Sequence, residues 1–94
     1  MTCYVDDLQN YPPESIKPAA RRYGTRWCHM TADTLPELLA MAQQLKLAPA
    51  WIQTSSNGIR HVDLVPSKRA QAIRLGAQVI TTKDMIIKAK DDEL

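Results

Sequence analysis

Histidine is the side chain in this sequence best suited to chemistry near neutral pH, and the chain contains only two, His29 and His61. An unperturbed imidazole titrates close to neutrality, so it can both accept and release a proton there. Each histidine is followed two positions later by another polar side chain, Thr31 after His29 and Asp63 after His61. Within a β-strand, residues two positions apart share a face. The spacing therefore predicts two polar pairs that meet at one site.

The segments that carry the histidines have the period-two pattern of half-buried strands. Over residues 27–32, a cysteine, a methionine and an alanine alternate with the face that carries His29. Over residues 59–65, Val62 and Leu64 alternate with the polar positions. We therefore expect both histidines on the face that points away from the core.

Two kinds of chemistry are open to such a site. In the first, which needs no cofactor, one histidine removes a proton and the other delivers one, while Asp33 or Asp63 orients an imidazole by accepting its N–H. In the second, His29, His61 and one or two of Asp6, Asp33 and Asp63 bind a divalent metal ion that activates water for hydrolysis. The preferred set is His29, His61 and Asp63. The spacing of these ligands matches no standard zinc pattern, so the sequence leaves both open.

Further polar residues are candidates for binding a ligand. Asp6 and Asp7 end a predicted first strand, and open α/β sheets place ligand groups just beyond the carboxyl ends of their strands. The helix predicted after Pro66 carries three cations, which is typical of a site that holds phosphate. The candidate ligand-binding residues are Asp6, Asp7, Trp27, Thr31, Lys68, Arg69 and Arg74.

The composition indicates one small globular domain over residues 1–94, because 45% of the residues are hydrophobic. The net charge is +2, and removing the three carboxylates of the acidic tail at residues 91–94 would raise it by three, to +5. A cationic body favours a phosphate-bearing small molecule or a nucleic acid as partner. Without a long apolar run, we expect a cytoplasmic protein with no membrane partner and with reduced cysteines.

Between the first two strands lies a long, basic, proline-containing loop, residues 8–26, which is either mobile or a lid over a ligand. Thr34 and Glu37 have the spacing of a capping box and start a helix that we expect to run to about Lys46. An Asn-Gly pair at residues 57–58 predicts a tight hairpin that sets Thr54 opposite His61.

The last third of the chain should add two helices and a strand. Ser67 is the expected N-cap of a helix that ends at Gly76. A short buried strand over residues 78–81 and a helix over residues 83–90 complete the pattern. The predicted fold is therefore α/β or α+β: one small mixed sheet with about three helices, mainly on one face.

Five short motifs occur together and in order along nearly the whole chain: YVDD, WCHMTADT, WIQ, HVD and SKRAQAIRLGA. In this combination the chain resembles domain-of-unknown-function family 4031, a family of uncharacterised bacterial and phage proteins. The resemblance implies a small cytosolic protein. It implies no particular activity, so function must come from the residues.

Two functional hypotheses follow, and the sequence does not decide whether the protein is an enzyme. In the first, a site with two histidines and an aspartate binds a nucleotide or nucleic acid and hydrolyses a phosphoester, by acid–base or metal-assisted catalysis. In the second, the polar face is a non-catalytic module, such as a phage accessory protein, that captures a ligand or forms a homodimer.

Overall fold

A computed structural model describes residues 2–55 and 58–92. These described residues form one six-stranded mixed sheet and three α-helices, which confirms the predicted fold class in its α+β form. Part of the predicted Asn-Gly turn and the end of the acidic tail, residues 93–94, lie outside the described residues. Within these ranges, no helix combines the length and the apolar character that a membrane crossing needs.

Five of the strands form a continuous sheet with β3 at its centre. In order across the sheet they are β4 (Gln53–Thr54), β5 (Arg60–Leu64), β3 (Arg26–Ala32), β1 (Cys3–Val5) and β6 (Gln78–Val79). All these neighbours are antiparallel except β1 and β6, which are parallel. The sixth strand, β2 (Gln9–Asn10), pairs with the beginning of β3.

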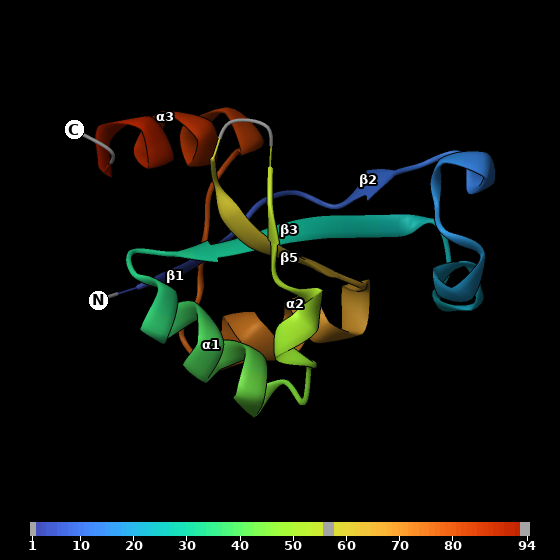
Figure 1. Cartoon of the computed structure of the whole chain (residues 1–94), viewed down its shortest axis with the longest axis horizontal. Coiled ribbons are helices and arrows are strands. Elements are labelled where there is room, and N and C mark those ends of the chain that lie inside the picture. The colour runs from blue at the N-terminus through green and yellow to red at the C-terminus, as the bar shows by residue number, and fades with distance from the viewer. Residues whose placement is uncertain (1, 56–57, 93–94) are drawn as a thin grey trace.

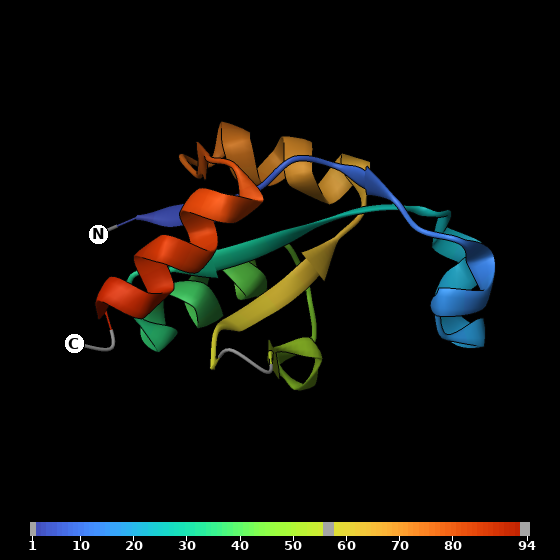
Figure 2. The same cartoon turned by 90° about the horizontal axis from the view of Figure 1, so that it is seen from above.

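Helices lie on both faces of the sheet (Figure 1). Helices α1 (Leu35–Gln44) and α2 (Pro66–Arg74) lie together on one face, whereas α3 (Thr82–Asp92) lies on the other. Figure 2 shows the same arrangement from above, with α3 in front of the sheet and the other two helices behind it. The first residues of α3 consequently approach the face predicted to carry the histidines.

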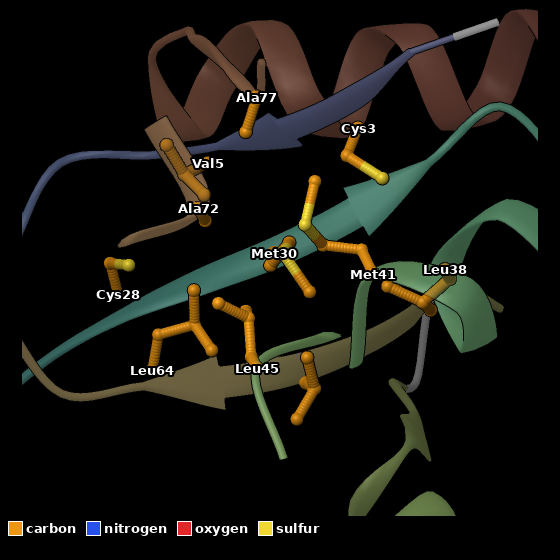
Figure 3. Packing of buried hydrophobic residues seen from close by; sticks show 11 residues of the cluster. Cys3, Val5, Cys28, Met30, Leu38, Met41, Leu45, Leu64, Ala72 and Ala77 are labelled. Atoms are coloured by element: carbon orange, nitrogen blue, oxygen red, sulfur yellow. The ribbon is translucent and has the colours of Figure 1, made fainter. Parts of the chain in front are cut away.

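The hydrophobic core fills the space between the sheet and the pair α1 and α2 (Figure 3). Cys28 and Met30 of β3 and Leu64 of β5 point into it, as the period-two pattern predicts, and Leu38 and Leu45 of the first helical segment meet them. All five side chains are at most 1% exposed. Burying a leucine or methionine side chain contributes roughly 1.5–3 kcal/mol, so this layer fixes the positions of β3 and β5.

The predicted capping box starts α1. The Thr34 hydroxyl oxygen accepts a hydrogen bond from the Glu37 backbone N–H at 3.4 Å and lies 3.0 Å from Glu37 Oε1. The helix ends two residues earlier than expected, with Leu45 as its C-cap and Lys46 at a φ of 59°. With these ends, α1 turns Leu38 toward the sheet, where it is part of the hydrophobic core.

The structure corrects the predicted β4–β5 hairpin by one residue. Gln53, and not Thr54, lies opposite His61. The reason is that the Ser55 N–H donates to the Ile59 carbonyl oxygen at 2.9 Å, which closes the hairpin in a different register from a two-residue turn. Trp51, shortly before β4, belongs to a 3-10 helix that starts at a proline and is 53% exposed.

Two further details of the second half differ from the sequence-based expectation. Helix α2 begins at Pro66, so Val65 and not Ser67 is the N-cap, and no side chain caps the helix. The strand β6 contains only Gln78 and Val79 and is exposed, because it forms an edge of the sheet. The last helix begins at Thr82. The hydroxyl of the preceding residue, Thr81, accepts a hydrogen bond from the Asp84 N–H at 3.0 Å.

The predicted loop over residues 8–26 is an ordered extension of the sheet. Strand β2, two short 3-10 helices (Pro13–Ser15 and Pro18–Tyr23) and the first residues of β3 form an arm, which we define as residues 9–27. The arm projects beyond the end of the three α-helices (Figures 1 and 2). None of its described side chains is buried, so the hydrophobic core does not include it.

Candidate functional site

The two histidines and Asp63 come together on the sheet face opposite the core. His29 of β3 and Asp63 of β5 are direct partners across the antiparallel pair. His61 precedes Asp63 by two residues and so shares its face. The imidazole rings of the two histidines meet edge to face, with 5.4 Å between their centroids.

The three side chains direct their ligand atoms toward a common point. Asp63 Oδ1 lies 4.0 Å from His29 Nε2 and 3.8 Å from His61 Nε2. One ligand atom from each residue can be chosen so that all three lie within 4.8 Å of one another. The side chain of His61 is only 12% exposed, whereas that of Asp63 is 43% exposed. The group is therefore anchored in the sheet and open to solvent on one side.

Asp6, the residue directly after β1, holds His29 in place. Its side chain is completely buried, and it accepts hydrogen bonds from the His29 backbone N–H at 2.6 Å and from His29 Nδ1 at 2.7 Å. The Thr82 hydroxyl, in the first turn of α3, donates to the same carboxylate at 2.8 Å. Arg69 Nε of α2 donates to the Asp6 carbonyl oxygen at 2.9 Å. One buried carboxylate thus joins β1, β3 and α3.

The electrostatics of this pair favour an ionised carboxylate. Burial by itself would raise the pKa of Asp6, but the hydrogen bonds from His29 and Thr82 outweigh burial and lower it. The hydrogen bond to Asp6 is also the main reason that the pKa of His29 is raised, and burial opposes that rise. The two residues therefore stabilise each other's charged forms.

These hydrogen bonds also determine which imidazole nitrogen faces the site. An ionised Asp6 can only accept, so His29 carries a proton on Nδ1, and in the neutral ring Nε2 presents its lone pair. His61 Nδ1 lies 3.1 Å from the Ile59 carbonyl oxygen, which also can only accept. Both rings consequently present Nε2 toward Asp63, as metal-ligating histidines with a hydrogen-bonded second nitrogen do.

Two imidazole nitrogens and one carboxylate oxygen suit a divalent transition metal such as Zn²⁺. Three protein ligands leave at least one coordination position for water or substrate, which is typical of catalytic sites. The residues present therefore fit a metal ion, and the set His29, His61 and Asp63 is the one that the sequence suggested for this role.

Other predicted site residues lie elsewhere or have different partners. The Asp33 carboxylate accepts a hydrogen bond from the Thr2 N–H at 3.0 Å, at the far end of β3. It does not orient His29, and Asp6 has that function instead. The Thr31 hydroxyl donates to the Arg60 carbonyl oxygen at 2.8 Å, which ties β3 to β5.

The cations of α2 are divided between two environments. Arg69 contacts the Asp6 backbone and lies 4.0 Å from the exposed Asp7, so it borders the site from the side. Lys68 and Arg74 also belong to α2, which covers the core face, and the structure does not bring them to the histidines. Trp27 shares the face of His29, and its Nε1 donates to the Gly24 carbonyl oxygen at 3.0 Å.

Sequence reasoning missed Thr82 and Gln9. The Thr82 hydroxyl also accepts a hydrogen bond from Gln9 Nε2 at 3.2 Å, which connects the arm to the Asp6–His29 pair. These contacts join residues 73 and 76 positions apart, so no local pattern could reveal them. Asp6 had a local signal, its position just after a strand, but its orienting role follows only from the pairing of β1 with β3.

Comparison with known proteins gives a family but no activity. No curated protein and no solved structure has a significant match to this chain. The family model described as "Protein of unknown function (DUF4031)" matches residues 16–92, which include both histidines and Asp63. The match covers most of the 94 residues, so the chain belongs to the DUF4031 family.

Proposed function

We propose that this protein is a metal-dependent hydrolase of phosphoesters, with a divalent transition metal bound by His29, His61 and Asp63. The observation that carries the proposal is the convergence of the two Nε2 atoms and the Asp63 carboxylate, with each Nδ1 engaged by an acceptor. Both imidazoles are thereby preset as ligands before any ion binds.

The same geometry favours a metal over a metal-free acid–base pair. A general acid and a general base act on different atoms of a substrate, so they normally face each other across it. Here the two rings contact each other, and both Nε2 atoms flank the same carboxylate oxygen. That arrangement leaves room for an ion between the groups rather than for a substrate.

A bound ion would supply Lewis acidity and a water molecule of lowered pKa. His29, His61 and Asp63 would hold it, and Asp6 would keep the His29 ring in orientation and add negative charge beyond it. In hydrolysis, the water oxygen bonds to phosphorus, the ester P–O bond breaks, and the leaving oxygen takes a proton. The cation surplus of the chain body supports an anionic substrate.

Zinc binding and turnover of model esters test the proposal. We expect one Zn²⁺ per chain by calorimetry, and hydrolysis of bis(p-nitrophenyl) phosphate or p-nitrophenyl phosphate that needs the ion. His61→Ala and Asp63→Asn should each lose at least about tenfold in zinc affinity and should have no measurable turnover.

The control for charge alone is Asp84→Asn, which removes an exposed carboxylate in the first turn of α3. It should bind zinc like the unmodified protein. Unchanged zinc affinity in Asp63→Asn, or a metal-loaded protein that cleaves neither ester, would contradict the proposed function.

A further inference from the structure

The arm belongs neither to the hydrophobic core nor to the proposed metal ligands, so its presence needs another explanation. Its described side chains are all exposed or half-buried, so the arm gains little from the hydrophobic effect. It nevertheless has a defined backbone: the Tyr11 N–H donates to the Thr25 carbonyl oxygen at 2.9 Å, beyond the pairing of β2 with β3. A surface built in this way is available to a partner.

The face that carries the histidines continues onto the arm. Gln9 lies opposite Trp27, and the Tyr11–Thr25 hydrogen bond extends the same ladder by one residue beyond Asn10 and Arg26. Because strand side chains alternate, Gln9, Tyr11 and Trp27 are on the same face as His29. Two aromatic rings therefore follow the histidines along one continuous surface.

Contacts between the arm and the site support this continuity. The Tyr11 hydroxyl donates to Gln9 Oε1 at 3.4 Å, and Gln9 in turn contacts Thr82, the partner of Asp6. The pKa of Tyr11 is raised, first by burial and then by the negative charges of Asp6 and Asp63. Tyr11 consequently lies within electrostatic reach of Asp6 and Asp63.

The outer part of the arm is cationic. Lys17, Arg22 and Arg26 are exposed, and Glu14 is the one acidic residue among positions 9–27 of the sequence. The Arg22 guanidinium lies 4.8 Å from the centroid of the Tyr23 ring, and that ring is 49% exposed. Cations interleaved with exposed aromatic rings are the combination that binds phosphates and stacks bases.

We propose that the arm binds single-stranded nucleic acid through Tyr11 and Trp27, on the face of the histidines, and through the exposed cations Lys17 and Arg22 of its outer part. The strand would then continue to the proposed metal site, so nucleic acid is the substrate class of that site; this second part rests on the proposed function. A duplex fits less well, because its bases are already stacked on each other and cannot stack on Tyr11 or Trp27.

Fluorescence anisotropy with labelled oligonucleotides of about 15 residues, dT and rU, tests the binding surface, since single-strand sites span roughly 4–16 nucleotides. We expect binding of at least one oligomer by the metal-free protein, at least about fivefold weaker in Trp27→Leu. Lys17→Gln/Arg22→Gln should reduce the slope of log affinity against log salt by about 1.4, which is the value for two phosphate contacts on a single strand.

Matched controls lie outside the arm. Trp51→Leu removes a tryptophan that is 53% exposed, and Lys46→Asn removes a cation at a left-handed position that asparagine tolerates. Both should bind the oligomers as the unmodified protein does. If Trp27→Leu and the double cation variant bind no more weakly than these controls, or if a 15-base-pair duplex binds as tightly as either single strand, the proposal is wrong.

Two measurements separate this proposal from the proposed function. Asp63→Asn should bind the oligomers with unchanged or higher affinity and cleave none of them, since it keeps the arm intact. Lys17→Gln/Arg22→Gln should still hydrolyse bis(p-nitrophenyl) phosphate at the unmodified rate but cleave oligonucleotides more slowly. Oligomer binding without any cleavage would contradict nucleic acid as the substrate of the proposed metal site. It would not contradict the binding of nucleic acid by the arm.

Discussion

At the scale of single residues, Asp6 makes the site more than a chance cluster of polar side chains. Its carboxylate is buried and receives three hydrogen bonds, two of them from His29. A buried carboxylate is costly unless it is paired, so its placement here fixes the His29 ring. Asp6 does not reach the common point of the ligand atoms, and we therefore regard it as a positioning residue.

Replacing Asp6 by asparagine should weaken zinc binding by about 10–100-fold, the usual effect of removing an outer-shell partner. The isosteric amide retains the packing but removes the negative charge. Thr82→Val should give a smaller loss, because the Asp6–His29 pair remains. Zinc titration of both variants measures the effect, and their circular dichroism melts show whether the fold persists. Equal zinc affinity in Asp6→Asn and the unmodified protein would refute the positioning role.

Strand alternation alone places two of the three proposed ligands together, whereas His29 joins them only because β3 pairs with β5. His61 and Asp63 are two positions apart, so any strand through them would put them together. Asp33 was misplaced for the opposite reason: its position relative to His29 depends on where β3 ends and on its contact with Thr2. Which side chain orients His29 depends on how distant strands pair, and the local sequence pattern does not contain that information.

At the scale of elements, the two predicted helix starts provide an internal comparison. Thr34 caps α1 as expected, whereas Ser67 lies inside α2 and caps nothing. Thr34→Ala should lower the free energy of unfolding by about 1 kcal/mol, because the Glu37 N–H loses its acceptor. Ser67→Ala should change it by less than about 0.5 kcal/mol. Urea denaturation measures both, and a larger effect at Ser67 than at Thr34 would contradict the observed caps.

The elements also show where sequence patterns stop being informative. Helix α1 was predicted nearly to its ends, since its capping box is a local signal. The β4–β5 register was wrong by one residue, because a hairpin register depends on loop length, which an Asn-Gly pair does not fix. The arm looked like a loop because β2 contains only Gln9 and Asn10, which are too few for a periodic signal.

At the scale of the whole molecule, the core and the site are two sides of the same strands. In β3, Cys28 and Met30 point into the core while His29 points away from it. The packing of α1 and α2 against β3 and β5 therefore supports the proposed metal ligands from behind. The arm, by contrast, extends past this packed region and takes no part in it. Rigid ligands beside a less supported binding surface would let the arm adapt to a strand while the site stays ordered.

The two cysteines report on the integrity of this packed region. Cys28 is 1% and Cys3 is 8% exposed, and both are free thiols. Burial raises the pKa of Cys28 to about 12, so the reactive thiolate is scarce in the folded state. With excess Ellman's reagent at about pH 8, we expect both thiols to react fully in denaturant and only slowly in the native protein. Leu64→Ala should lower the free energy of unfolding by about 2–5 kcal/mol. When both thiols react only from the globally unfolded state, this loss should accelerate the labelling of Cys3 and Cys28 by the same factor. Labelling of Cys28 at the rate of an exposed thiol in the native protein would show that β3 is not held as the structure describes.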